Sequence, residues 1–127
     1  MNNCIFCALI TNGNITYANE HAVAFPDGFP LNPGHTLVVP RRHETDLFEL
    51  PASERHAVWS LVDEVHADLA KQLHPDGFNV GLNVLEPGGQ TIPHAHVHVI
   101  PRSTGDVPDP KGGVRWVIPS RAAYWLE

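Results

Sequence analysis

Three histidines alternate with apolar residues in the segment TIPHAHVHVI, at positions 94, 96 and 98. Successive side chains of a β-strand point to opposite faces, so His94, His96 and His98 would share one face, with neighbours roughly 7 Å apart. The apolar residues between and after them would point to the other face, into a core: Ala95, Val97 and Val99. The segment therefore predicts a half-buried strand over residues 93–100. A solvent-exposed face would normally carry Thr, Ser or Lys, and three imidazoles in register indicate chemistry instead.

The segment before this one also alternates. Four apolar residues share one face of a strand predicted over residues 78–84: Phe78, Val80, Leu82 and Val84. A Gly-rich turn, EPGGQ, joins the two strands, and antiparallel pairing is the simple arrangement. Because the two core faces must coincide, the two polar faces coincide as well. We therefore expect Asn83 and Asn79 on the side that carries the histidines.

One long amphipathic helix is predicted over residues 52–73. Apolar residues recur there at spacings of three and four: Val58, Leu61, Val62, Val65, Leu69 and Leu73. Charged residues occupy the polar side: Glu54, Asp63, Glu64, Asp68 and Lys71. Shorter strands are predicted over 22–25 and 35–39, and CIFCALI fits a short helix or an entry loop. The fold class is α+β, an antiparallel meander sheet with one long helix packed on it.

Length and composition set the remaining limits on the fold. The 127 residues, 43% of them hydrophobic, predict a single domain spanning 1–127. Residues 103–127 are rich in Pro and Gly, and we expect them to wrap over the body as a tail. The chain has no apolar run of membrane-spanning length and no secretory signal. No membrane partner and a cytoplasmic location are therefore the default expectations.

The charge of the chain limits its partners. Lys and Arg total 8 against 14 acidic residues, which gives a net charge of −6. This balance counts against nucleic acid as a partner, because a nucleic-acid backbone needs a basic surface. It does not exclude a small anionic substrate, since backbone amides and a few local cations can bind phosphate without a favourable overall field.

Three hypotheses compete for the histidine segment. Alternate strand histidines can chelate zinc, although the nearest acids that would complete a hydrolytic metal site, Glu86 and Asp106, do not extend the strand pattern. Imidazole also attacks phosphorus well when an acceptor holds it in the required tautomer, and EPGGQT would then be a phosphate-binding turn. The third hypothesis, surface histidines without a role, suits one exposed histidine better than three in register.

The segment HAHVHVI resembles the signature of the histidine-triad superfamily, in which three histidines alternate with apolar residues. Further segments look like those of that family, in the family order: CIFC, AFPD, PGHTLVVPRRH, the long helix, GFNVGLN and GGQTIPHAHVHVIPR. Together they cover most of residues 4–102. The resemblance implies a nucleotide hydrolase or transferase that acts at the α-phosphate, with a purine nucleotide as substrate.

The resemblance also implies a catalytic set: His94, His96, His98 and Gln90. The central histidine of the family, here His96, attacks phosphorus and forms a covalent nucleotidyl-histidine that water then cleaves. His98 would orient His96 and stabilise it as charge builds, and a backbone carbonyl would accept the proton of the second ring nitrogen. His35 either buttresses this site or is an ordinary structural histidine. The implied mechanism requires no catalytic metal.

Substrate contacts are implied at six positions: Asp27, Phe6, Asn83, Gly89, Gln90 and Thr91. Gln90 and Thr91 match positions that contact phosphate or the leaving group, and Asn83 matches a position on the phosphate side. Asp27 matches a ribose-hydroxyl contact of some members. Phe6 either walls the base pocket or packs in the core.

Cys4 and Cys7 form a CxxC motif, whose spacing in a reducing compartment favours a metal site or a redox pair over a structural disulfide. A thioredoxin-like redox motif needs a preceding strand, and only three residues precede Cys4. Some bacterial histidine-triad proteins resemble this arrangement and bind structural zinc, with further ligands that match His43 and His94. The resemblance thus implies a Cys2His2 zinc site.

The resemblance leaves the substrate and the role open. One branch of the family hydrolyses dinucleoside polyphosphates, and the segment GDVPDPKGGVRWVIP looks similar to the tails of bacterial members grouped with it. A second branch cleaves nucleoside phosphoramidates. An adaptor that binds nucleotide or zinc without turnover is the alternative from a different class. The family resemblance further implies a homodimer.

Overall fold

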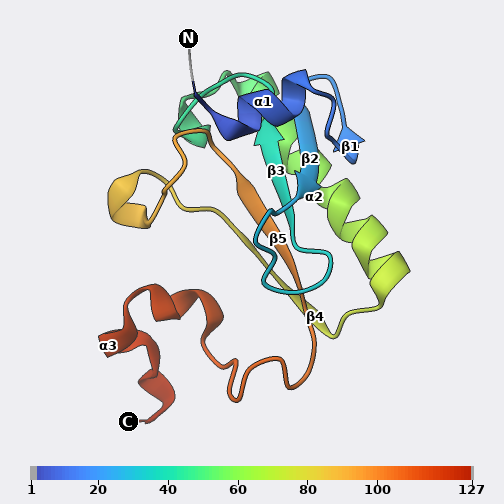
Figure 1. Ribbon diagram of the computed structural model, residues 1–127. Coiled ribbons are helices and arrows are strands. Elements are labelled where there is room, and N and C mark those ends of the chain that lie inside the picture. The colour runs from blue at the N-terminus through green and yellow to red at the C-terminus, as the bar shows by residue number, and fades with distance from the viewer. Residues whose placement is uncertain (1–2, 127) are drawn as a thin grey trace.

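The computed structural model describes residues 3–126, and in this part of the chain five strands form one antiparallel sheet (Figure 1). The strands are β1 (Tyr17–Ala18), β2 (Ala22–Pro26), β3 (Thr36–Pro40), β4 (Gly77–Gly81) and β5 (Val97–Arg102). Their order is β1-β2-β3-β5-β4, so β1 to β3 form a meander and β5 returns between β3 and β4. One long helix, α2 (Ala52–Leu73), lies between β3 and β4 in the chain. The predicted α+β class, with an antiparallel sheet and one long helix, is confirmed.

Short helical segments complete the described chain. They are α1 (Ile5–Thr11), η1 (Leu47–Glu49), η2 (Glu86–Gly88), η3 (Gly113–Val117), α3 (Pro119–Ala122) and η4 (Tyr124–Leu126). The bounds of α2 are those predicted from its periodicity, and the helix ends where His74 takes a left-handed backbone conformation with a φ of 47°. Within residues 3–126, no helix is both long and apolar enough to cross a membrane.

The two strands on the histidine side are shorter than the alternating patterns predicted. β4 ends at Gly81, and β5 begins only at Val97. The residues before β5 bond to a loop instead of to β4, since the Ala95 N–H donates to the carbonyl of Glu44 at 2.7 Å. Only His98 of the three histidines therefore lies within β5. The prediction that all three share one strand face is wrong.

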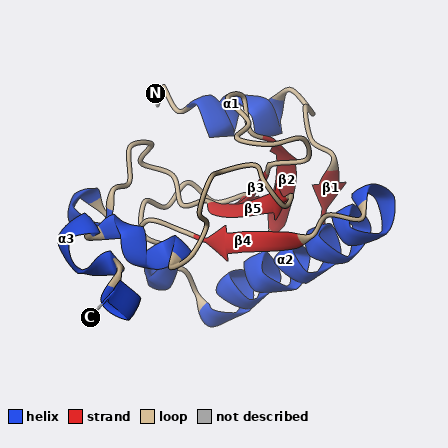
Figure 2. Ribbon diagram, turned by 90° about the horizontal axis from the view of Figure 1, so that it is seen from below, coloured by secondary structure: helices blue, strands red, loops and turns tan. Residues whose placement is uncertain are grey.

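The two faces of the sheet belong to two cores (Figure 2). α2 covers one face, and the core between them includes Ala22, Ala24, Val38, Val97 and Val99 from the strands and Val58, Leu61, Val62, Val65 and Leu69 from the helix. α1 lies on the opposite face, and its core residues are Phe6, Val23, Phe25, Leu37 and Val39. Because side chains alternate along a strand, β2 and β3 supply residues to both cores.

α1 leaves the outer part of its own face uncovered. Along β5, buried Val97 and Val99 alternate with half-buried His98 and Ile100. His98 pairs with Leu37 of β3, and paired residues of an antiparallel sheet share a face. His98 and Ile100 are therefore on the α1 face, next to the strands that α1 covers.

Glu54 is buried, although the helical pattern predicts it on the polar side of α2. Its two carboxylate oxygens accept hydrogen bonds from Nε and Nη2 of Arg42, at 2.8 and 2.7 Å. These bidentate bonds satisfy the carboxylate, and they hold the pKa of Glu54 below its usual value. The pair ties the first turn of α2 to the loop after β3, which also carries His43.

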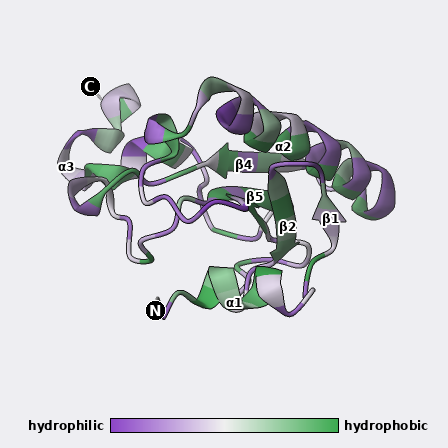
Figure 3. Cartoon of the chain, turned by 90° about the horizontal axis from the view of Figure 1, so that it is seen from above, coloured by the Kyte–Doolittle hydropathy of each residue, from purple (hydrophilic) through white to green (hydrophobic). Residues whose placement is uncertain are grey.

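The tail after β5 lies to one side of the sheet, away from α1 and α2 (Figure 1). Its first turn is anchored by Arg102, whose Nε and Nη2 donate to Asp106 at 2.7 Å each. Farther along, Arg115 donates to the carbonyls of Ala122 and Arg121 within the tail itself. Many of its apolar side chains are exposed, and Figure 3 shows hydrophobic residues in the tail as well as on the strands. The wrapping of residues 103–127 over the body stays a prediction, and residue 127 lies outside the described residues.

Gly34 precedes His35 in a tight turn with a φ of +90°. A Cβ at this position would lie 2.6 Å from Cδ1 of Leu73 and 3.1 Å from Cγ of Pro101. We predict that Gly34→Ala lowers the free energy of unfolding by about 2 kcal/mol, because backbone strain and overpacking add. Urea denaturation measures the change.

Gly28→Ala is the matched control, since a Cβ there would meet nothing within 4 Å. It should change the free energy of unfolding by less than about 0.5 kcal/mol. Equal stabilities of the two variants would contradict the packing described for the Gly34 turn.

Candidate active site

His96 is held in one tautomer by a backbone carbonyl. Its Nδ1 lies 2.9 Å from the carbonyl oxygen of His94, and a carbonyl can only accept, so Nδ1 carries the proton. The Nε2 of a neutral His96 then presents a lone pair. The ring is 7% exposed and packs edge-on against Phe6, with the centroids 5.1 Å apart. This is the kind of acceptor that the family resemblance implied for the central histidine.

His98 takes the opposite tautomer through a chain of hydrogen bonds. The Leu31 N–H donates to Nδ1 of His35 at 3.0 Å, so the proton of a neutral His35 is on Nε2. That Nε2 lies 2.9 Å from Nδ1 of His98 and 3.3 Å from Oδ2 of Asp27. Nδ1 of His98 therefore accepts, and its Nε2 carries the proton. Two adjacent histidines thus present a lone pair and a donor.

The local electrostatics keep His98 and His35 neutral. Burial lowers the pKa of His98 to about 4, and the neighbouring His96 and His35 act in the same direction, while Asp27 opposes the shift. Burial also lowers the pKa of His35, again against the attraction of Asp27. At pH 7 the donor on His98 is therefore a neutral N–H group, not a cation.

The EPGGQT turn uses many of its polar groups internally. The amide of Gly88 and that of Gln90 both donate to the carbonyl of Leu85, and the amide of Gly89 donates to that of Glu86. These three N–H groups are bound within the turn. The phosphate-binding role predicted for the turn therefore cannot use them without rearrangement.

Gln90 braces the same turn with its side chain. Its Oε1 accepts from the amide of Leu85 at 2.7 Å, and its Nε2 donates to the carbonyls of Thr45 and Ile92 at 2.9 and 3.0 Å. Both the oxygen and the nitrogen of the side-chain amide are thus hydrogen-bonded within the protein. In this conformation Gln90 supports the loop that leads to His94, and contact with phosphate stays a prediction.

The other predicted substrate residues lie in different places. Asn83 and Gly89 are neighbours, since a Cβ added to Gly89 would lie 3.7 Å from Cγ of Asn83. The Asp27 carboxylate faces His35, with Oδ1 accepting from the backbone of the following loop. Thr91 is exposed and lines a small cavity beside Cys4. Phe6 is only 4% exposed and lies in a core. Asn83 is thus the predicted contact that shares a cavity with a triad histidine.

That cavity has a volume of about 510 Å³ and opens beside His98 on the face that α1 leaves uncovered. Its sheet side includes Gly81, Leu82 and Asn83 as well as His98 and Ile100. Residues of the tail form another side. A volume of this size is typical of small-molecule sites.

His35 and Arg102 have roles that the sequence left open or missed. The sequence allowed His35 as a buttress or as a structural residue, and its bond to His98 makes it a buttress of the triad. Arg102 holds the start of the tail, because its Nη1 donates to Asn79 at 2.6 Å and its Nε and Nη2 donate to Asp106 at 2.7 Å each. Long-range pairing of this kind leaves no signal in a local pattern.

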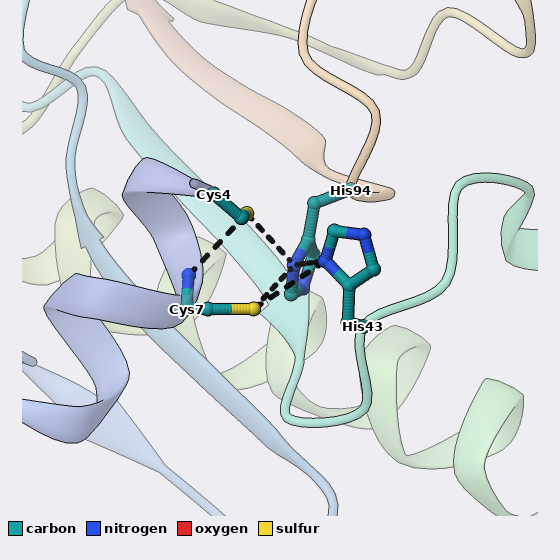
Figure 4. A group of neighbouring side chains, drawn as sticks. All are labelled: Cys4, Cys7, His43 and His94. Carbon is teal, nitrogen blue, oxygen red and sulfur yellow. Dashed lines mark hydrogen bonds between the residues drawn. The ribbon is translucent and has the colours of Figure 1, made fainter. Parts of the chain in front are cut away.

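Cys4, Cys7, His43 and His94 come together at the end of α1 (Figure 4). His94 Nδ1 lies 3.4 Å from Cys4 Sγ, 3.6 Å from Cys7 Sγ and 3.2 Å from His43 Nδ1. The Nε2 of His94 lies 2.8 Å from the Pro40 carbonyl and donates to it, so Nδ1 has its lone pair toward the cluster. Burial lowers the pKa of His94, which keeps the ring a neutral ligand.

The spacing of these four atoms fits a tetrahedral metal ion. Zinc bonds of about 2.3 Å to sulfur and about 2.0–2.1 Å to nitrogen give tetrahedral edges of about 3.3 Å between two nitrogens and about 3.6 Å between nitrogen and sulfur. The described edges are 3.2 Å between the nitrogens and 3.4 to 3.6 Å between nitrogen and sulfur. The cluster is therefore compatible with a structural zinc ion.

The five-stranded sheet, with His96 and His98 side by side, defines a histidine-triad protein. A comparison with known protein families gives the same class. The family model of the HIT domain matches residues 11–105. The chain therefore belongs to the HIT domain family. An uncharacterized HIT-like protein of Methanocaldococcus jannaschii is 41% identical over 107 residues, which span 81% of each chain.

Two solved structures illustrate the similarity. A HIT family protein from Bacillus anthracis has a TM-score of 0.77 and 36% identity, covering 83% of this chain and 77% of that one. A zinc-bound histidine-triad family protein from Mycobacterium smegmatis has a TM-score of 0.74 and 31% identity, covering 84% of both chains. The fold described above is thus the fold of solved HIT proteins.

Two longer relatives have names that state an activity. The asymmetrical bis(5′-nucleosyl)-tetraphosphatase of Schizosaccharomyces pombe is 33% identical over 80% of this chain and 56% of its own length. The AP-4-A phosphorylase of Mycobacterium tuberculosis is 39% identical over 77% of this chain and 48% of its own length. Relatives of this chain thus include a nucleotide hydrolase and a nucleotide phosphorylase.

The lowered pKa of His98 predicts how stability depends on pH. Below pH 6.5 an unfolded His98 binds a proton, whereas the folded residue resists protonation down to about pH 4, so stability falls as the pH falls through this window. We predict that wild type loses about 1–2 kcal/mol more than His98→Gln between pH 7 and pH 4. Urea denaturation across the pH series measures this difference.

The control is His56→Gln, which removes an exposed histidine of α2. Its stability should follow that of wild type at every pH. If the curves for wild type and His98→Gln run parallel, the neutral state of the half-buried His98 is contradicted.

Proposed function

We propose that this protein is a hydrolase of dinucleoside polyphosphates that cleaves at the α-phosphate through a covalent nucleotidyl-histidine at His96. The observation that carries the proposal is the pair of opposite tautomers, a lone pair on His96 Nε2 next to a neutral N–H on His98. Membership of the HIT family and the two relatives with named activities support the class of reaction.

The proposed first step is attack of His96 Nε2 on the α-phosphorus. A P–N bond forms, the bond from phosphorus to the bridging oxygen breaks, and the electron pair leaves with that oxygen. His96 keeps the proton on Nδ1 and becomes a nucleotidyl-imidazolium, whose positive charge the His94 carbonyl stabilises. The N–H of His98 donates a hydrogen bond to the oxygen on which charge develops.

The proposed second step is hydrolysis of this intermediate. Water attacks phosphorus, the P–N bond breaks, and its electron pair returns to Nε2 of His96. The proton of the water passes to solvent, and a nucleoside monophosphate is released. His96 is then back in its starting tautomer, still bound to the His94 carbonyl.

A second candidate substrate is a nucleoside phosphoramidate. Among the described residues that line the cavity beside His98, Arg102 is the one Lys or Arg, and Asp106 and Asn79 already bind its guanidinium. An uncharged amine as leaving group would need no cation there, whereas a polyphosphate would profit from one. Rates on the two substrate classes decide between them.

We further propose that Cys4, Cys7, His43 and His94 bind a structural zinc ion. Bound there, zinc would crosslink α1, the loop after β3 and the segment before β5. The reaction would take place at His96 without the metal. The homodimer implied by the family resemblance stays a prediction, and β4, an edge strand of the sheet, offers backbone groups for it.

The covalent step predicts a mass adduct. We expect a gain of one adenylyl group, the mass of adenosine monophosphate less one water, when wild type is mixed with diadenosine tetraphosphate, quenched in neutral denaturant within the first turnover and measured as intact protein. His96→Ala should show no adduct and a rate at least about 1,000-fold lower, because the nucleophile is absent.

His56→Ala, in an exposed part of α2, is the control and should label like wild type. Turnover with no adduct in wild type and equal rates in His96→Ala would exclude the covalent mechanism. Binding without turnover would favour an adaptor.

The zinc proposal predicts one zinc ion per chain in protein purified without chelator, measured by elemental analysis. Cys7→Ser should lower the zinc content well below one and lower the melting temperature, because a ligand that joins two segments is lost. Ala8→Ser, a neighbouring exposed change on α1, is the control and should keep the metal. Zinc-free wild type with the same melting temperature as the zinc-loaded protein would contradict a structural ion.

A further inference from the structure

The cavity beside His98 extends away from the nucleophile. Along β5 the residues on the cavity side follow in the order His98, Ile100 and Arg102, and His96 precedes them. The rings of His96 and His98 are neighbours, with centroids 5.3 Å apart. The cavity therefore begins at His98, the donor, and extends from there in the direction away from His96, the nucleophile.

The direction of the cavity matches the geometry of phosphoryl transfer. In an in-line displacement the leaving group departs opposite the attacking atom. With His96 as the attacking residue and His98 donating to the bridging oxygen, the leaving group lies beyond His98. The space beyond His98 is this cavity, so it belongs to the leaving group and not to the transferred nucleotide.

The lining of the cavity defines the chemistry of its occupant. Much of the wall is apolar: Leu31, Val80, Leu82, Ile100, Val114 and Val117. Amide side chains add donors and acceptors on the rim: Asn32, Asn79 and Asn83. The one Lys or Arg among the described lining residues, Arg102, is paired with Asp106. Apolar walls with a few amides suit a flat heterocycle.

The tail supplies one of these walls. Gly113 approaches β4 so closely that a Cβ would lie 3.3 Å from Nδ2 of Asn79. The side chains of Val114 and Val117 line the cavity although they are 69% and 70% exposed overall. These two valines therefore contribute little to the folded core. Their position beside the sheet gives them a use in binding.

We propose that this cavity is the subsite for the nucleobase of the leaving nucleotide, with Val114 and Val117 of the tail as residues that determine specificity. The proposal rests on the proposed function, and it assigns the second nucleoside of a dinucleoside polyphosphate to this subsite. Substrates that lack a second nucleoside do not use it.

The test compares two substrates that share the transferred adenylyl group. Diadenosine tetraphosphate carries a second base, whereas adenosine 5′-phosphoramidate does not. Val114→Ser/Val117→Ser should lower kcat/KM for diadenosine tetraphosphate at least about fivefold, because apolar contact with the base is lost. Its kcat/KM for the phosphoramidate should stay within about twofold of wild type.

Ile118→Ser is the matched control, because Ile118 is an adjacent, 56% exposed apolar residue of the tail outside the cavity lining. It should leave both rates unchanged. Equal effects of the double variant on both substrates, or none on either, would overturn the subsite while leaving the proposed function intact. A change of oligomeric state in the double variant, seen by sedimentation, would overturn it in favour of an interface between copies of the chain.

A direct binding measurement covers the case in which wild type turns over neither substrate and the proposed function fails. Calorimetry then compares diadenosine tetraphosphate with adenosine monophosphate on wild type. Tighter binding of the dinucleotide that is lost in Val114→Ser/Val117→Ser would support the base subsite. The same affinity difference in both proteins would overturn it.

Discussion

Buried His94 makes three separate interactions, and the geometry of the site depends on them. Its Nε2 donates to the carbonyl of Pro40 at the end of β3, and its Nδ1 faces Cys4 and the rest of the metal cluster. Its own backbone carbonyl accepts from Nδ1 of His96. The residue thus fixes the segment before β5 against β3, offers a ligand atom and sets the tautomer of the proposed nucleophile. A change in the metal cluster that moves His94 would therefore also move the carbonyl that sets the tautomer of His96.

The second histidine of the pair is set from another part of the chain. The loop between β2 and β3 supplies Leu31 and His35, which orient His98 through two hydrogen bonds. Asp27 lies close to the imidazoles of His35 and His98, and its negative charge alone would raise the pKa of His98. Burial outweighs this effect, so the pKa of His98 stays low. A protein with a net charge of −6 thus keeps a neutral donor at its site. A neutral N–H group can stabilise a departing oxyanion through a hydrogen bond.

Much of the fold could be predicted from local patterns, and the reason is physical. The 3.6-residue period of α2 gave its bounds, and the alternation of Val97 and Val99 gave the buried face of β5. The same alternation wrongly predicted that His94 lies on the strand. The N–H of Ala95 donates to the carbonyl of Glu44, which is far away in sequence, and this bond holds the segment outside the sheet. Burial of Glu54 was missed for a similar reason, since its partner Arg42 lies on a loop outside the helix.

The site was predicted in part. The resemblance brought together the four residues around His94 as one cluster, and their atoms lie within 4.8 Å of one another. It also implied a backbone carbonyl as the acceptor for His96, which the His94 carbonyl supplies, and it left the role of His35 open until its bond to His98 was seen. The cavity beside His98 depends on the placement of the tail against β4, which no periodicity encodes.

The measurement that tests the central claim most directly is long-range proton–nitrogen NMR of the imidazole rings at pH 7. The account predicts that His96 carries its proton on Nδ1 with a bare Nε2, and that His98 carries its proton on Nε2 with a bare Nδ1. Opposite tautomers on these two neighbours would support a nucleophile and a donor set by the fold. A proton on Nε2 of His96, or a cationic His98, would contradict it.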